Sequence, residues 1–552
     1  MGPTSSGTRS LRRSVPASAR GRLRPGLGAC GIGSGGGGGE ARRLPHSGLI
    51  VVPVGSPAPA PPYGTAPAVG HPHGTAATHP RGPRMNAPPG TPGTPAPLPP
   101  LAGGPGGADA LRPLLDTVLD ALRTGTAARR GPLPAGGPDA VAARVTAALG
   151  DVLPEHGTGD HEALRTLVHT LAAGAADPAD PLCAAHLHCP PLAVAAAADL
   201  AVSALNPSLD SWDQAPAASA IEALLTRTLA TELYGTPHAD ALVTTGGTEA
   251  NQLAVLLARE RHGPRLTVLH GANAHHSVPR AAWLLGLPPA QSLPTPTGTL
   301  DPARLDEALA RTPRPVLVTA TAGTTDAGLI DPLDAIADLC DHHRAELHID
   351  AAYGGLLTLS PRHRHKLQGL HRAHSITLDL HKLGWQPVAA GLIAVPDTAL
   401  LAPLAHQADY LNATDDTEAG LPDLLGRSLR TTRRPDALKI AATLRSLGRD
   451  GLARLIDHTC AAAHHLAELL DAHPRFELHS APTLTTVLFR PTPTDDDQLA
   501  TLRRTLLLDG SAVLGRATAD GRLWLKATLL NPHSTAGDLD TLVTLLEGRT
   551  QP

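Results

Sequence analysis

The side chains best suited to chemistry in this sequence begin with a lysine. Lys382 follows residues 376–378, an apolar run that predicts a buried strand, and His381 stands directly before it. A lysine at the end of a buried strand is costly unless it is paired or used in chemistry. In one interpretation its stem is buried and its ammonium reaches water. In the other, Lys382 is a reactive amine that forms a Schiff base with an aldehyde cofactor.

A second stretch predicts a binding site for an anion. Residues 241–243 predict a strand that runs into Gly246 and Gly247, after which Thr248 opens a helix. Small residues let a phosphate approach the free amides of a helix N-terminus, where the helix dipole also favours it. The stretch has neither the lysine of a P-loop nor the G-x-G-x-x-G pattern, which disfavours nucleotide binding. The alternative is a plain strand-to-helix turn capped by Thr248.

Two further polar residues stand at the ends of expected strands. Asp350 follows the strand expected at residues 346–349, and the carboxyl ends of strands are where open α/β sheets bind ligands. A buried carboxylate needs a partner such as a protonated pyridine nitrogen, and the small Ala352 leaves room for a flat ring. His275 follows the strand expected at residues 266–269.

The paired histidines do not predict a metal site. His275 and His276 are adjacent, a spacing that suits neither a pair on one helix face nor a zinc signature. His186 and His188 would share a face if their segment were a strand, but no second cluster with ligand spacing completes a site. We therefore expect no metal.

A phosphate cradle, a buried aspartate, a histidine and a strand-terminal lysine are together the parts needed to bind pyridoxal 5'-phosphate. The motifs that contain them resemble, in order and interval, those of the group II pyridoxal-dependent amino-acid decarboxylases. These motifs are Thr245-Gly-Gly-Thr-Glu-Ala250, Ala274-His-His-Ser-Val278, Gly323-Thr-Thr325, His348-Ile-Asp-Ala-Ala-Tyr353 and His381-Lys382. The resemblance covers roughly residues 180 to 530. It implies the aspartate-aminotransferase-like fold of pyridoxal-phosphate enzymes (fold type I) and a homodimer.

The resemblance implies three catalytic residues. Lys382 would carry the cofactor as a Schiff base, Asp350 would pair with the ring nitrogen, and His275 would stack on the ring. The implied cofactor-binding residues are these three together with Gly247, Thr248, Thr325, Ala352 and His381.

The chain departs from the aromatic branch of this family at two places. That branch has Asn where this chain has Asp379, and an acid there would repel the phosphate unless it turned toward Lys382 or His381. Aromatic decarboxylases also reprotonate Cα with a tyrosine on a mobile loop, and the comparable residues 419–425 contain no tyrosine. Tyr410 lies upstream of that loop. The group that donates a proton to Cα stays unassigned, and His275 is a candidate.

The implied reaction converts an L-amino acid to its amine and carbon dioxide, with a diamino acid such as L-2,4-diaminobutyrate as the expected substrate. Four stretches resemble the diaminobutyrate and siderophore-type diamine branch, at residues 185–191, 209–214, 409–412 and 428–434. His188 and Asp213 are the expected substrate contacts, and Asp213 would read a distal ammonium unless it is only a solvated surface charge. The alternatives are an aromatic amino acid or glutamate as substrate, or another fold-type-I reaction such as transamination or amine-oxidising aldehyde synthesis.

Composition limits the partners and the compartment. Forty-six basic and 50 acidic residues nearly balance in a chain of 552, which leaves no footprint for nucleic acid or an anionic membrane. The five cysteines are scattered and indicate a reducing compartment, and no apolar run approaches the length of a membrane span. We expect a cytoplasmic protein whose ligands are small molecules.

The elements that must position these residues alternate between strand and helix. Strands are expected at residues 241–243, 266–269, 316–318, 346–349, 376–378 and 391–395, and helices at 248–262, 302–311 and 332–343. This alternation predicts an α/β fold with a mostly parallel sheet. The expected parts are a disordered Pro/Gly-rich extension at 1–105, a helical segment at 106–230, a cofactor-binding large domain at 231–425 and a small α+β domain at 426–552. Met85 is the expected true start.

Overall fold

The computed structural model describes residues 98–406, 408, 411 and 413–550. Met85, Tyr410 and nearly all of the expected extension lie outside these residues. The chain divides into two units, Met1–Thr94 and Pro95–Pro552, and all that follows concerns the second.

A seven-stranded sheet carries the larger part of this unit. Its strands are β1 (Asp240–Thr244), β2 (Thr267–Gly271), β3 (Gln291–Leu293), β4 (Val316–Thr321), β5 (Glu346–Asp350), β6 (Ser375–Asp379) and β7 (Gly391–Val395). The spatial order is β1-β7-β6-β5-β4-β2-β3, and the mostly parallel α/β sheet expected from the sequence is confirmed. All six expected strands form. The short β3 was not predicted because its three residues, two of them exposed and polar, lack an apolar pattern.

One strand of this sheet runs against the others. β7 is antiparallel to both β1 and β6, whereas the pairs from β6 through to β3 are all parallel. Every strand except β7 therefore ends at the same edge of the sheet. Chain segments that follow these carboxyl ends are brought together there, although they are far apart in sequence.

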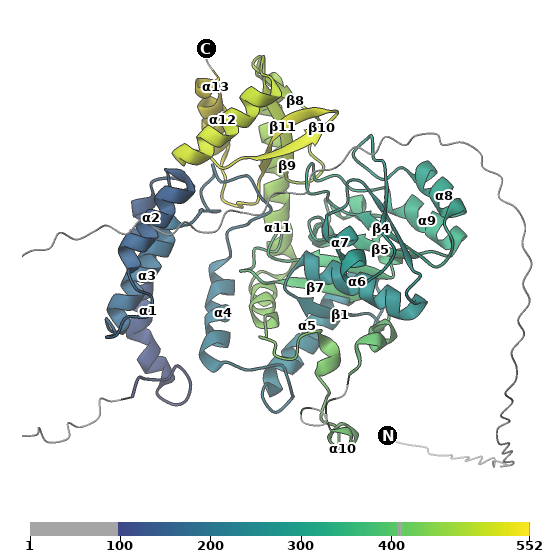
Figure 1. Ribbon diagram of the computed structural model, residues 1–552, viewed down its shortest axis with the longest axis horizontal. Coiled ribbons are helices and arrows are strands. Elements are labelled where there is room, and N and C mark those ends of the chain that lie inside the picture. Colours follow the sequence, from purple (N-terminus) through teal and green to yellow (C-terminus); the bar gives the residue numbers. More distant parts are fainter. Residues whose placement is uncertain (1–97, 407, 409–410, 412, 551–552) are drawn as a thin grey trace, which may run out of the picture. The chain divides into compact units, whose positions relative to one another are not determined.

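Helices connect the strands and cover the sheet (Figure 1). The connecting helices are α6 (Gly247–His262), α7 (Ser277–Leu284), α8 (Pro302–Arg311) and α9 (Leu333–His343). The three helices predicted from the sequence are confirmed to within one residue. Shorter elements follow at η1 (Gly355–Leu359), η2 (Arg364–Leu367), η3 (Leu370–Arg372), η4 (Thr398–Leu404), α10 (Thr414–Glu418) and η5 (Leu425–Arg427).

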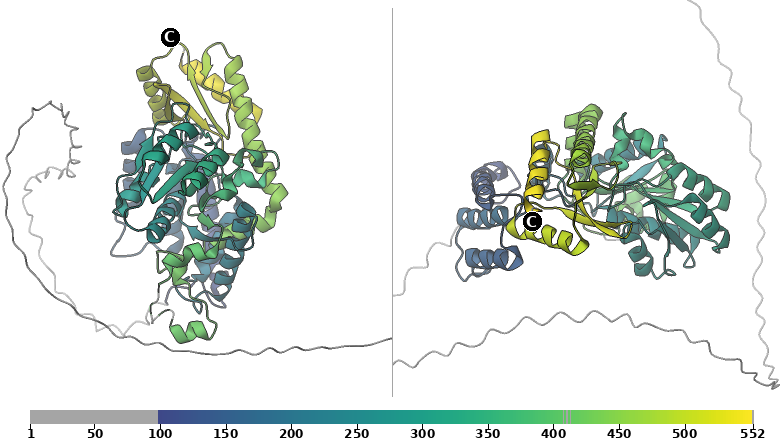
Figure 2. Two further views of the ribbon diagram at one scale, coloured as in Figure 1. Left: turned by 90° about the vertical axis from the view of Figure 1, so that its right-hand side faces the viewer. Right: turned by 90° about the horizontal axis from the view of Figure 1, so that it is seen from above.

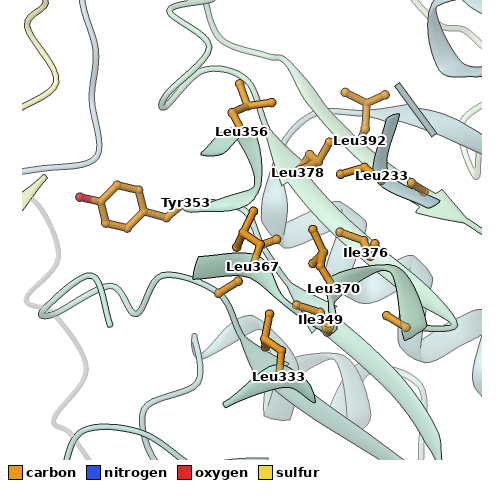
Figure 3. Packing of buried hydrophobic residues seen from close by; sticks show 14 of the residues in the cluster. Leu233, Leu333, Ile349, Tyr353, Leu356, Leu367, Leu370, Ile376, Leu378 and Leu392 are labelled. Carbon is orange, nitrogen blue, oxygen red and sulfur yellow. The ribbon is translucent and has the colours of Figure 1, made fainter. Parts of the chain in front are cut away.

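Apolar side chains on one face of the sheet form its main core (Figure 3), and the opposite face packs in two smaller clusters, which include Leu242 and Leu317. Ile349 of β5 and Ile376 of β6 are fully buried between helices, as expected for strands that are covered on both faces. Leu233 packs into this cluster from α5 (Pro216–Tyr234), and the Tyr234 hydroxyl donates a hydrogen bond to the carbonyl of Ala394 at 3.1 Å. The core thus fixes the strand ends that carry the polar residues.

Helices fill the segment before β1. They are α1 (Gly107–Arg129), α2 (Gly137–Leu149), α3 (Asp160–Gly174), α4 (Ala193–Leu205) and α5. The right-hand view of Figure 2 shows α1–α3 as a group set apart from the seven-stranded sheet. Gly125 lets α1 approach α3 closely, since a Cβ there would lie 2.6 Å from the carbonyl oxygen of His169.

The C-terminal residues form a smaller α+β layer, as expected. Its elements are α11 (Ala437–Ala472), β8 (Phe476–Leu478), β9 (Thr486–Pro491), α12 (Asp496–Asp509), β10 (Gly515–Ala519), β11 (Arg522–Thr528) and α13 (Ala536–Arg549). The strands make an antiparallel sheet in the order β10-β11-β9-β8. The long α11 serves both layers, because Ile440 packs in the main core and Leu466 packs in the core of the smaller sheet.

Two features are absent from the described residues. None of the helices there is long and apolar enough to cross a membrane. Nor does that part of the chain contain a group of three or more His, Cys, Asp or Glu residues that could hold a metal ion.

Candidate active site

A cavity of about 320 Å³ opens at the sheet edge where β1, β4, β5 and β6 end. All the catalytic and cofactor-binding residues named from the sequence line this cavity. They are Lys382, His275, Asp350, Gly247, Thr248, Thr325, Ala352 and His381. Residues from five separate segments therefore meet as the parallel topology requires.

Lys382 lies in the turn after β6, beside two partners. Its Nζ is 3.5 Å from Oδ2 of Asp379, and Oδ1 of Asp379 is 2.8 Å from Nδ1 of His381. The amide of Gly247 donates a hydrogen bond to Asp379 Oδ2 at 3.2 Å. The acid that replaces the aromatic branch's Asn thus faces both Lys382 and His381, which is the orientation that relieves its repulsion of a phosphate.

The glycine turn before α6 brings the backbone close to this cluster. A Cβ on Gly246 would lie 2.9 Å from Cε1 of His381, and a Cβ on Gly247 would lie 2.9 Å from Cβ of Ala352. The helix begins at Gly247 with no side-chain cap, so Thr248 does not cap the turn. The first amides of α6 have no partner within the helix, which suits an anion.

Asp350 ends β5 with its carboxylate buried at the cavity wall. Its side chain is 5% exposed, and it accepts hydrogen bonds from the amide of Ala352 at 3.1 Å and from Nδ2 of Asn251 at 2.7 Å. Among the described residues, no cationic side chain lies within ion-pair distance of Asp350. A buried carboxylate without a cation fits the protonated ring nitrogen of pyridoxal phosphate, and the glycine cradle fits its phosphate.

His275 lies just before α7 and faces the same cavity. Its Nδ1 is 2.8 Å from the hydroxyl of Ser277 and accepts a longer contact of 3.3 Å from the Ser277 amide. Burial lowers the pKa of His275, while the nearby Asp350 raises it by a smaller amount. His276 stacks at a tilt, with ring centroids 4.1 Å apart.

Asn251 is a site residue that received no role from its sequence motif. It is buried on the inner face of α6, where its side chain contacts Asp350, Ser277, His348 and Thr377. The sequence signal that places Asn251 at the site is its spacing, because a polar residue four positions after Gly247 lies on the same helix face as the glycine turn. Burial lowers the pKa of His348 to about 4, so this histidine is neutral at physiological pH.

The two expected substrate contacts are not brought together. His188 is exposed in an irregular segment rather than a strand, next to the cavity-lining Leu187. Asp213 is exposed between α4 and α5, where it accepts a hydrogen bond from Ser211, and it is not among the residues that line the cavity.

The fold and the cavity define a pyridoxal-phosphate enzyme of fold type I. The family model described as "Pyridoxal-dependent decarboxylase conserved domain" matches residues 151–492. The chain belongs to this family and is a pyridoxal-phosphate-dependent carboxy-lyase.

Individual relatives and solved structures agree with this family. The chain is 43% identical to an L-2,4-diaminobutyrate decarboxylase of Rhizobium meliloti (strain 1021), over 70% of this chain and 81% of the relative. It is 32% identical to an L-2,4-diaminobutyrate decarboxylase of Acinetobacter baumannii, over 70% and 84%. A solved Vibrio parahaemolyticus structure, the glutamate decarboxylase domain of diaminobutyrate-pyruvate transaminase and L-2,4-diaminobutyrate decarboxylase, is similar with a TM-score of 0.73 at 31% identity. That alignment covers 81% of this chain and 97% of the solved chain.

Proposed function

We propose that this protein decarboxylates L-2,4-diaminobutyrate to propane-1,3-diamine and carbon dioxide. The observation that carries the proposal is the 43% identity to a diaminobutyrate decarboxylase across 81% of that relative. The cavity supports a small, polar substrate, since its wall is formed largely by Thr, Gly, Asp and His residues.

Each side of the cavity would hold a different part of the cofactor. Gly247 and Thr248 would bind the phosphate at the start of α6, where the Thr248 amide is available and the small Gly247 allows close approach, with His381 alongside. Asp350 would hold the ring nitrogen protonated, because its buried carboxylate stabilises a positive charge there. His275 and Ala352 would border the ring. When bound, pyridoxal phosphate would supply an aldehyde that attaches to amines and a protonated pyridine that accepts the electron pair left on Cα when carbon dioxide departs.

Lys382 and Asp379 would handle the amine and its proton. Asp379 would hold the side chain of Lys382 in place, since its Oδ2 lies 3.5 Å from Nζ. Attachment to the aldehyde requires the neutral amine, and the proton can stay within the contact between Asp379 and His381. The same pair can return a proton to Lys382 when the product amine leaves.

We also propose that the protein works as a homodimer. Support comes from leucines that α1 and α3 leave on the surface, including Leu119 at 63% and Leu171 at 70% exposure. Apolar side chains gathered on one helix pair mark an interaction surface more often than free solvent. Leu119→Arg combined with Leu171→Arg should convert dimer to monomer in light scattering, whereas Leu508→Arg on α12 should not. A dimer that survives the double variant would place its interface elsewhere.

The four described cysteines, Cys183, Cys189, Cys340 and Cys460, are all unpaired. Free thiols fit a reducing compartment, and we propose the cytoplasm as the location.

The substrate proposal is tested by incubating the holoenzyme with single amino acids. The panel is L-2,4-diaminobutyrate, ornithine, lysine, aspartate, glutamate, tyrosine and tryptophan, with carbon dioxide, amine, ammonia and peroxide all measured. We expect diaminobutyrate to have the highest kcat/KM and carbon dioxide and diamine to form in equal amounts. Preference for another amino acid would overturn the substrate, and ammonia with peroxide would indicate amine oxidation instead.

A further inference from the structure

Asn251 makes four hydrogen bonds while its side chain is almost fully enclosed. Its Nδ2 contacts Asp350 Oδ2 at 2.7 Å and Ser277 Oγ at 2.9 Å. Its Oδ1 contacts Thr377 Oγ1 at 2.7 Å and His348 Nε2 at 3.0 Å. A primary amide has two N–H donors and two acceptor lone pairs, so every one of them is used.

The chemistry of these partners fixes the direction of each bond. An ionised Asp350 can only accept, so the amide nitrogen of Asn251 must face it. The second N–H then donates to Ser277 Oγ. On the other side, the amide oxygen accepts from the Thr377 hydroxyl and from His348, which must therefore carry its proton on Nε2.

The same reasoning extends to the ring of His275. Ser277 Oγ accepts from Asn251, which leaves its own hydrogen for His275 Nδ1 at 2.8 Å. An Nδ1 that accepts a hydrogen bond carries no proton, so the proton of a neutral His275 is on Nε2.

We propose that Asn251 is a positioning residue that holds the Asp350 carboxylate and, through Ser277, sets His275 as the neutral Nε2–H tautomer. The charge of Asp350 is thereby coupled to the proton position on a ring that borders the same cavity. His275 then offers the cavity a hydrogen-bond donor rather than a base. The lowering of the His275 pKa by burial agrees with a neutral ring.

A simpler cause of the tautomer is the Ser277 amide, which also points its hydrogen at His275 Nδ1, at 3.3 Å. The two causes predict different results for Asn251→Asp. The new carboxyl at position 251 has a lone pair free for Ser277, whether or not it shares a proton with Asp350. The Ser277 hydroxyl then donates to this carboxyl and turns away from His275. The Ser277 amide is unchanged by the substitution.

Neutron diffraction from crystals of the cofactor-free protein, exchanged into D₂O, measures the tautomer directly. In the wild type we expect deuterium on His275 Nε2, none on Nδ1, and the Ser277 deuteroxyl directed at Nδ1. The opposite arrangement would overturn the proposal. In Asn251→Asp we expect deuterium to appear on His275 Nδ1. A tautomer unchanged from the wild type would show that the Ser277 amide, and not Asn251, sets it. Asn531→Asp, the same substitution at another buried asparagine, should leave His275 unchanged.

Cofactor affinity provides a second readout that requires no turnover. Asn251→Leu removes the donor that holds Asp350, and the cofactor-free protein should bind pyridoxal phosphate roughly ten-fold or more weakly. Thr377→Val removes a donor on the far side of the same amide and should change affinity less than about three-fold. Equal losses in the two variants would mean that Asn251 acts only through general packing.

This inference rests on the proposed assignment of Asp350 and His275 to the cofactor site. The two can fail separately. If the tautomer changes as predicted but the protein makes no diamine, only the substrate proposal is overturned. If diamine forms but the tautomer does not change, only the role of Asn251 is overturned.

Discussion

The two sides of the cavity hold their polar groups in different ways. On the ring side, Asn251 and Asp350 are buried and their hydrogen bonds are short, at 2.7 Å to one another. On the lysine side, Asp379 faces His381 and Lys382 at once, and its contact with Lys382 is a longer 3.5 Å. A saturated network resists rearrangement, whereas a shared carboxylate can exchange partners. The ring side is therefore suited to holding an orientation and the lysine side to moving a proton.

The largest effect should come from the ring side. Asp350→Asn keeps the shape of the side chain but cannot hold the ring nitrogen protonated, so kcat should fall about 100-fold or more. Cofactor content, measured by absorbance at saturating pyridoxal phosphate, should stay near that of the wild type. Near-normal turnover would mean that another group protonates the ring.

The next prediction concerns pH and the buried His348. Its pKa is about 4 in the folded protein against an ordinary value of 6.5, so the unfolded chain binds more protons between these limits. Stability should therefore fall as pH drops from 6.5 toward 4, by up to about 3 kcal/mol from this residue. His348→Gln has no ionisable ring and should remove that part of the slope. Parallel slopes of unfolding free energy against pH in the two proteins would exclude the effect.

The smallest effect should come from the lysine side. Asp379→Asn replaces the carboxylate beside Nζ of Lys382 with a neutral amide, which releases the amine from its ion pair. Pyridoxal phosphate should attach to the cofactor-free variant roughly three- to ten-fold faster at neutral pH, as followed by stopped-flow absorbance. A slower attachment would show that Asp379 assists the lysine as a base rather than holding its ammonium.

The sequence predicted the lysine side more completely than the ring side. Lys382, His381 and the glycine turn each follow an apolar strand, and parallel strand ends must meet, so their convergence follows from topology. The orientation of Asp379 was also foreseeable, because a buried acid beside a phosphate site must find cations.

The ring side depends on contacts that no local pattern contains. Asn251 and Thr377 are 126 residues apart, and their hydrogen bond exists only once α6 lies against β6. The charge of Asp213 indicates a substrate contact, but its place outside the cavity lining is set by how the loop between α4 and α5 packs. β3 was not predicted because it is stabilised by pairing with β2 and not by an apolar pattern in its own residues.

The most direct test of the whole account is to locate the lysine that carries the cofactor. The protein has four lysines, and three are already engaged: Lys366 donates to the Thr483 carbonyl, Lys439 is enclosed beside Asp436, and Lys526 donates to the Thr325 carbonyl. Lys526 is the strongest competitor, because burial lowers its pKa and makes its amine more reactive.

The measurement is borohydride reduction of the holoenzyme followed by peptide mapping with mass spectrometry. We predict a pyridoxyl group on Lys382 alone. Lys382→Ala and Lys382→Arg should carry no mark and lose nearly all turnover, since a guanidinium stays protonated and cannot attack an aldehyde. Lys526→Arg should still be marked at Lys382. A pyridoxyl group on Lys526, Lys366 or Lys439 of the wild type would contradict the assignment of the active site.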